Sequence, residues 1–185
     1  MSEEFIIELC TKLSPLLGVI VGGLITYFTM NKIEQKRWQQ EKQEKLSTLK
    51  REALSKALEW IEPLRNAEIK ASGLLMSVIR GDIDVDDYFD KICQVRHDLF
   101  DELKPIELPA SQRAVIGSAF YKLRNTILLS FDEIRIIGVK YGHDVRHHKK
   151  PLMGFDKCNA LLETLTNNIT NLENNLQEEL YQAYV

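Results

Sequence analysis

The chain has 185 residues, a formal net charge of −3, 28% charged residues and 44% hydrophobic residues. This composition is typical of a folded protein and argues against a disordered chain or a general polyanion binder. The three cysteines, Cys10, Cys93 and Cys158, lie far apart and show no metal-binding spacing, so they suit a reducing compartment. We expect no metal and no cofactor.

The first expected element is residues 13–31, LSPLLGVIVGGLITYFTMN, which carries no charge. A bilayer core of about 30 Å needs roughly 20 helical residues, so this stretch predicts a single N-terminal transmembrane helix after a short segment, residues 1–12. Residues 32–51 contain seven Lys or Arg against three Glu, and such residues stay on the cytoplasmic side. We therefore expect a single-pass membrane protein, with its N-terminus outside, its C-terminus cytoplasmic and the lipid bilayer as a partner.

Small residues recur every four positions within this stretch, at Ser14, Gly18, Gly22 and Thr26. They lie along one stripe of the helix, and GVIVG is a GxxxG motif. Because small residues let helix backbones approach closely, the stripe predicts the interface of a homo-oligomer. The alternative is that such residues are simply common in membrane helices.

Residues 32–45 contain no Gly or Pro and are rich in strong helix formers, so they predict a polar juxtamembrane helical stalk. Its basic residues Lys32, Lys36 and Arg37 would form rings in a closed oligomer. Apolar residues then return at helical spacing, and residues 46–185 are expected to form a cytoplasmic helical bundle. The expected fold class is all-α.

Further helices are expected within the bundle. Pro63 predicts a kink or a break, and a second helix is expected over residues 64–79. The acidic residues 82–103 begin with an Asp-rich cap region and continue with apolar residues at helical spacing. Ser111 is expected to cap a long apolar helix over residues 113–142.

The last helix has the most regular pattern. Its apolar residues alternate spacings of four and three, which is a heptad seam. We interpret it as a face of an antiparallel bundle in preference to an intermolecular coiled coil. The seam comprises Cys158, Leu162, Leu165, Ile169, Leu172 and Leu176.

Candidate chemical groups concentrate in KYGHDVRHHKKP, residues 140–151, between the two last expected helices. A basic loop with histidines could bind RNA or another phosphate-bearing ligand. It could equally be a solvated turn, a lipid headgroup contact or a partner for the acidic residues 82–103. A metal would need further ligands beside His143 and His147. The candidate residues are His143, Arg146, His147, His148, Lys149 and Lys150.

A predicted span followed by an all-α bundle with a late Arg/His-rich loop resembles the membrane accessory proteins of type VI-B CRISPR systems, which are divergent HEPN proteins. The resemblance implies antiviral defence, a location in the bacterial inner membrane, a pore-like oligomer and activation by a partner such as the RNA-guided nuclease. Arg135 and His143 have seven residues between them, a longer spacing than in HEPN ribonucleases. No catalytic residue is therefore assigned.

Three functions remain open. The first is a non-enzymatic defence effector that assembles through its transmembrane helix and perturbs the membrane. The alternative is a membrane-anchored scaffold or adaptor whose bundle recruits a cytoplasmic partner. The third is a tethered ribonuclease that uses Arg135 or Arg146 with His143 or His147.

Overall fold

A computed structural model of the chain describes residues 3–146 and 155–184, with side chains at 14, 18–143 and 156–184. The described residues are helical apart from short connections, which confirms the all-α class. The chain divides into two units, an N-terminal unit (Met1–Leu46) and a C-terminal unit (Ser47–Val185). The elements in order are α1 (Glu3–Leu58), α2 (Ile61–Arg80), α3 (Val85–Leu103), the 3₁₀ helix η1 (Lys104–Ile106), α4 (Ala110–Ile116), α5 (Ser118–Arg146) and α6 (Phe155–Gln182).

The expected single transmembrane helix is wrong. In the part of the chain that the structure describes, no helix is both long and apolar enough to cross a membrane. Apart from Ser14, the described side chains of the uncharged stretch run from Gly18 to Asn31. Between these two residues the stretch contains three glycines and two threonines, which dilute its apolar side chains. The expected localisation as a single-pass inner-membrane protein is contradicted by the same finding.

The first break in the helical chain comes at residues 59–60, between α1 and α2. Pro63 was expected to cause it, but this residue lies in the first turn of α2. A proline is tolerated there because the first turn of a helix has N–H groups without intrahelical acceptors. The chain therefore turns from α1 into α2 at residues 59–60, and the side chain of Trp60 is fully buried.

The turn between α2 and α3 has the chemistry that its sequence predicts. Gly81 ends α2 in the left-handed region at φ 77°, and its N–H donates to the Val78 carbonyl. Glycine adopts this conformation without steric cost. The carboxylate of Asp84 then accepts from the backbone N–H of Asp87 at 2.8 Å, which caps α3 as expected.

The long apolar helix expected after Ser111 is divided in two. Its first part is α4, which begins at Ala110 after Pro109, so Ser111 is inside the helix and is not its cap. Gly117, at φ 82° and ψ 162°, separates α4 from α5. A glycine can take this backbone conformation where other residues rarely do, and it ends the short helix before the chain turns into α5.

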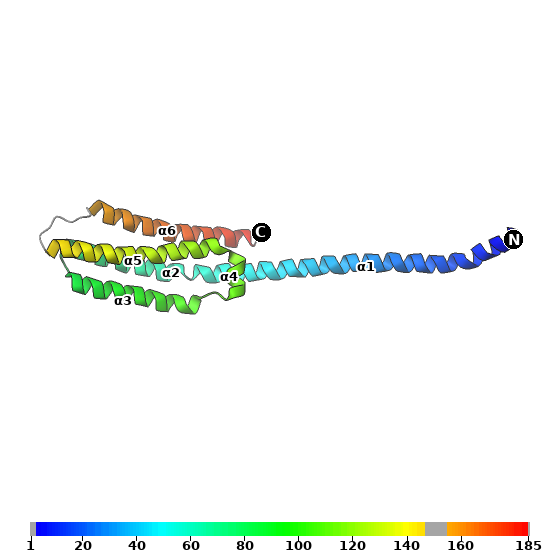
Figure 1. The fold of residues 1–185 in the computed structure, drawn as a ribbon, viewed down its shortest axis with the longest axis horizontal. Helices are drawn as coiled ribbons and strands as arrows, with labels where there is room; N and C mark the ends of the chain where they lie inside the picture. Colours follow the sequence, from blue (N-terminus) through cyan, green and yellow to red (C-terminus); the bar gives the residue numbers. More distant parts are fainter. Residues whose placement is uncertain (1–2, 147–154, 185) are drawn as a thin grey trace. The chain divides into compact units, whose positions relative to one another are not determined.

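In the C-terminal unit, α2, α3, α5 and α6 lie side by side, and neighbours in sequence run in opposite directions (Figure 1). Helix α5 contacts α2, α3 and α6, while α2 also contacts α3 and α6. The short α4 lies at the end of the bundle where α5 begins. The result is a bundle of four long helices in which α2 and α5 each contact the other three.

The seam expected on α6 lies in the bundle core. Cys158, Leu165 and Ile169 are fully buried, as are two further seam residues, while Leu162 is partly buried. The seam belongs to a core that includes residues of α2, α3 and α5, and α6 contacts α5 and α2. This agrees with an ordinary bundle face.

Helices α3 and α5 approach closely because two glycines of α5 leave room for side chains of α3. A Cβ atom added at Gly138 would lie 2.1 Å from Cζ of Tyr88, and one at Gly142 would lie 2.6 Å from Val85. The hydroxyl of Tyr88 donates to the Ile134 carbonyl at 2.8 Å, so its polar atom is satisfied inside the core.

Candidate functional site

The N-terminal unit exposes apolar side chains along α1. We call residues 18–33 the apolar segment of α1. Within it, Val19 is 76% exposed, Ile25 is 62% exposed and Phe28 is 61% exposed. Its other exposed large apolar residues are Ile20, Val21, Leu24, Tyr27, Met30 and Ile33.

These side chains surround the helix. Val19, Ile20 and Val21 are consecutive and all exposed, and successive residues of an α-helix point about 100° apart. An amphipathic helix would show only one apolar stripe, whereas a helix that is apolar on all sides is normally buried. The segment therefore has the character of an interior helix although its side chains are exposed in a single chain.

The stripe expected to form an oligomer interface lies on this surface. Ser14, Gly18, Gly22 and Thr26 are all exposed, and a Cβ atom added at either glycine would meet nothing within 4 Å. The hydroxyl of Thr26 donates to the Gly22 carbonyl at 2.8 Å. Because this polar group is satisfied within the helix, the stripe can lie against another helix without losing a hydrogen bond.

The basic residues Lys32, Lys36 and Arg37 are also exposed on α1, the first at the end of the apolar segment and the other two directly after it. Trp38 follows them, and the ammonium of Lys42 lies 5.5 Å from the centroid of its ring. This contact lies on the exposed surface of α1 and involves a side chain that is 65% exposed. The helix therefore changes from an apolar to a basic, polar surface within two turns.

The Arg/His-rich segment is only partly described. His143 is exposed near the end of α5, and Arg146 is the last residue of that helix. The first half of the expected loop is therefore helical. The side chain of Arg146 and the residues His147, His148, Lys149 and Lys150 lie outside the described residues.

The structure does not bring Arg135 and His143 into one site. They lie on the same helix, eight residues apart, which corresponds to about 12 Å of axial rise. The guanidinium of Arg135 lies over the ring of Phe89 at 5.9 Å and next to Asp132. Among the described residues, no group of His, Cys, Asp and Glu is arranged to hold a metal ion.

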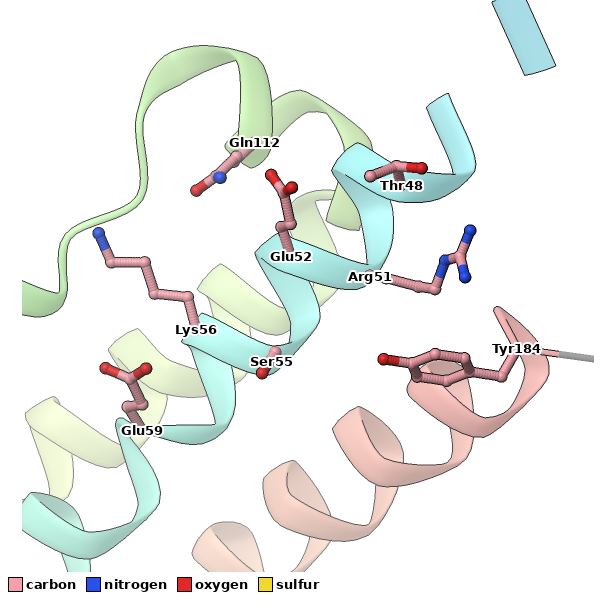
Figure 2. A pocket seen from close by; sticks show the side chains of 8 residues that line it. All are labelled: Thr48, Arg51, Glu52, Ser55, Lys56, Glu59, Gln112 and Tyr184. Carbon is pink, nitrogen blue, oxygen red and sulfur yellow. The ribbon is translucent and has the colours of Figure 1, made fainter. Parts of the chain in front are cut away.

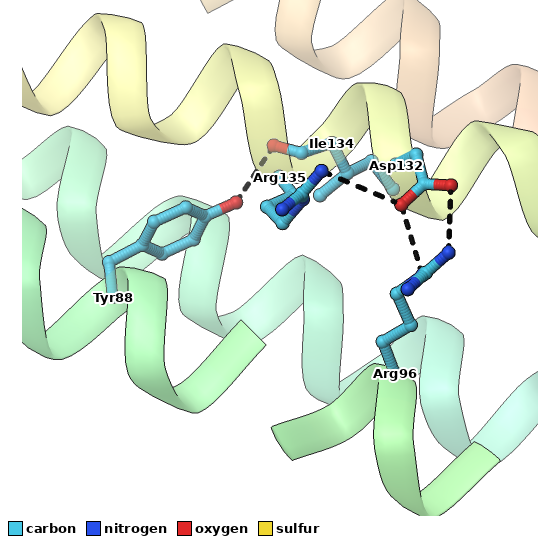
Figure 3. A network of polar contacts seen from close by, with 5 residues as sticks. All are labelled: Tyr88, Arg96, Asp132, Ile134 and Arg135. Carbon is cyan, nitrogen blue, oxygen red and sulfur yellow. Dashed lines mark hydrogen bonds and ion pairs between the residues drawn. The ribbon is translucent and has the colours of Figure 1, made fainter. Parts of the chain in front are cut away.

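A polar contact that the sequence did not reveal links α3 to α5 (Figure 3). The guanidinium of Arg96 makes two contacts with the carboxylate of Asp132, at 3.0 and 3.2 Å. The guanidinium of Arg135 approaches the same carboxylate at 3.9 Å. Near it, the hydroxyl of Tyr88 donates to the carbonyl of Ile134. These contacts link the two helices and hold them in register.

A groove of about 530 Å³ lies beside the last turns of α1 (Figure 2). Its walls are the last turns of α1 together with Gln112 of α4 and Tyr184. The guanidinium of Arg51 lies 5.2 Å from the centroid of the Tyr184 ring. Two cationic and two anionic side chains line the groove, so their formal charges balance.

Comparisons with known proteins give no relative. No protein-family model, no curated protein and no solved structure matches this chain. The function is therefore argued from the surfaces of the chain itself.

Proposed function

We propose that the chain is a self-associating scaffold or adaptor. Copies associate through the apolar segment of α1, and the helical bundle recruits a second protein. The observation that carries the proposal is the exposure of apolar side chains on all sides of residues 18–33. The RNA-guided nuclease that the resemblance implies is one candidate for the recruited protein.

Burial of the segment between copies would be favourable. Fully burying a large aliphatic or aromatic side chain contributes about 1.5–3 kcal/mol, and nine such side chains are exposed between Val19 and Ile33. An isolated helix is also marginal in water, because most helical stability in proteins comes from tertiary packing. Association would therefore stabilise the helix as well as cover its surface.

Other copies of α1 suit this surface because a single neighbouring helix covers only one side of it. Several copies packed around a common axis can cover more of the circumference, and the glycines at 18 and 22 permit close approach of the backbones. Lys32, Lys36 and Arg37 of each copy would then be gathered at one end of the assembled segment. Their mutual repulsion predicts that association strengthens as salt screens them.

Sedimentation velocity of the full-length chain over a dilution series tests the proposal. The wild type should sediment as an oligomer of the 21.4 kDa chain. Ile25→Glu places a charge in the apolar segment and should give a single chain. Gly22→Leu should also abolish or weaken association, because it fills the stripe.

The matched control is Ile69→Glu. Ile69 lies on α2 and is 69% exposed, so it has the same residue type and a similar exposure to Ile25. This variant should keep the wild-type size. A wild type that is a single chain at all concentrations would refute the proposal, as would an Ile25→Glu variant of unchanged size and unchanged helix content.

A further inference from the structure

A second groove lies between the first turns of α5 and the last turns of α6, which are at the same end of the bundle (Figure 1). We call it the α5–α6 groove. Its volume of about 300 Å³ is at the small end of the range for ligand sites, so it suits one side chain and not a whole helix. Its apolar side comes from α5, where Ala119 is exposed and Phe120 and Leu123 are partly buried against the core.

The other side of the α5–α6 groove is polar and comes from α6. The carboxylates of Glu178 and Glu179 line it, together with the side-chain amides of Asn175 and Gln182. In the described part of the chain, no lysine or arginine is among the lining residues. The α5–α6 groove therefore has two negative formal charges, whereas the charges of the groove in Figure 2 balance.

The carboxylates in this part of α6 differ in their partners. Glu179 accepts from the ammonium of Lys50 at 2.6 Å, and Glu173, earlier on the helix, accepts from the guanidinium of Arg65 at 2.5 Å. Glu178 is exposed, and among the described residues its carboxylate accepts only from a side-chain amide of the next turn, at 3.4 Å. One carboxylate of the α5–α6 groove therefore has no cationic partner in the part of the chain that the structure describes.

We propose that the α5–α6 groove binds a cationic side chain, an arginine or a lysine, of the protein that the bundle recruits. The proposal rests on the scaffold function above and names the chemistry of the recruited protein. Long cationic side chains place their aliphatic stems on apolar surface and their charged heads at its polar edge. Here the stem would lie on Ala119, Phe120 and Leu123, and the head would pair with the carboxylate of Glu178. The ring of Phe120 adds attraction for a cation.

Fluorescence anisotropy of labelled peptides, titrated with the full-length chain, tests the groove. The probes are a peptide of four arginines, a peptide of four lysines and a peptide of four citrullines, which keep the shape of arginine without its charge. At least one of the two cationic peptides should bind saturably. The citrulline peptide should bind about tenfold more weakly, because its hydrogen bond to the carboxylate lacks the charge of the donor. Equal binding of the citrulline peptide, or no saturable binding of either cationic peptide, would overturn the proposal.

Two variants separate the groove from the general attraction of a basic peptide to an acidic chain. Glu178→Gln removes the unpaired carboxylate and should weaken binding about threefold to tenfold. Its matched control is Glu163→Gln, which removes an exposed carboxylate of α6 outside the groove and should bind as the wild type does. Ala119→Phe fills the apolar side and should also weaken binding. Its control is Ala160→Phe, at an exposed alanine of α6 that does not line the groove.

Unchanged affinity in Glu178→Gln or in Ala119→Phe would overturn the site, as would equal losses in the two glutamate variants. A second copy is the alternative occupant, because residues 32–51 of α1 are basic. Glu178→Gln should therefore keep the sedimenting size of the wild type, and a smaller size would assign the groove to a second copy and contradict the proposal.

The test is independent of the proposed association. The Ile25→Glu single chain should bind the cationic peptides as the wild type does, and this result is expected even if the wild type itself proves to be a single chain. Loss of binding in Ile25→Glu would place the peptides on assembled α1 helices and would overturn the site in the bundle.

Discussion

Two apolar helix surfaces differ in what covers them. The seam of α6 is buried by helices of the same chain, and Leu165, Ile169 and Leu172 are fully buried. The apolar segment of α1 is exposed in the isolated chain, with Val19 and Ile25 largely accessible. Both surfaces are rich in large aliphatic residues. Apolar content alone therefore does not decide whether a helix finds its partners within its own chain.

The spacing of the apolar residues explains the difference. In α6 they recur every three or four residues, so they form one face that α5 and α2 can cover. In α1 they are consecutive, so they occupy every side of the helix. A surface of the second kind requires partners on several sides, which is why we assign it to association between copies.

The largest expected effect separates the two surfaces directly. Leu172→Ala removes a fully buried side chain of the α6 seam and should lower the free energy of unfolding of the bundle by about 2–5 kcal/mol. Leu24→Ala, on the exposed segment, should leave the free energy of unfolding of the bundle nearly unchanged and should weaken association instead. Urea denaturation followed by Trp60 fluorescence in the Trp38→Phe background measures the difference. Equal losses of stability in the two variants would contradict the comparison.

The contact between α3 and α5 provides the next test. Gly138→Ala would place a methyl group 2.1 Å from the ring of Tyr88 and should lower the free energy of unfolding by about 1–3 kcal/mol. Gly73→Ala is its control on α2, where a Cβ atom meets nothing within 4 Å. This change should be neutral or should stabilise by up to about 1 kcal/mol, because alanine favours helix over glycine. Thermal unfolding of both variants distinguishes packing from helix propensity.

A smaller effect is expected from the hydroxyl of Tyr88. Tyr88→Phe removes its hydrogen bond to the Ile134 carbonyl and should cost about 1 kcal/mol near neutral pH. Burial raises the pKa of Tyr88 above its ordinary value of 10.0, so the folded state favours the neutral phenol. The contribution of the Tyr88 phenol to the free energy of unfolding is present below pH 10.0. It is lost progressively above that pH, because the phenol then ionises in the unfolded chain but not in the folded one.

The variant should therefore lose less stability than the wild type as the pH rises above 10.0. Urea denaturation at neutral pH and at successive higher pH values measures this difference. Parallel pH profiles for the two proteins would show that Tyr88 is not responsible.

The smallest effect is expected from the ion pair between Lys50 and Glu179, which joins the last part of α1 to α6 at 2.6 Å. Both side chains are partly exposed, and such pairs contribute about 0–1 kcal/mol. Lys50→Met should lower stability by no more than this, and the loss should shrink as salt is added. A larger loss that salt does not reduce would point to packing of the lysine stem.

Much of the bundle could be predicted from the sequence because its signals are local. Asp84 caps α3, and Gly81 ends α2 in the left-handed region. The α6 seam follows from its own periodicity. Each of these features depends on residues within one or two turns, so a single sequence contains the necessary information.

The remaining features depend on distant parts of the chain. One exception is local: the cap predicted at Ser111 is wrong because α4 begins directly after Pro109, and Gly117 then separates α4 from α5. The contact of Gly138 with Tyr88 and that of the Trp60 ring with the Arg124 guanidinium join residues that are far apart in the sequence. The transmembrane helix was predicted from a run of uncharged residues, and no helix in the described part of the chain satisfies the length and apolarity that a span requires.

Amide hydrogen exchange of residues 18–33 tests the central claim most directly, measured on the full-length chain at high concentration and after dilution. Association through the apolar segment predicts strong protection at high concentration and a large loss of protection on dilution, while protection of the α6 seam stays unchanged. Fast exchange of residues 18–33 at both concentrations would contradict the account, because it would show that no other copy covers the segment.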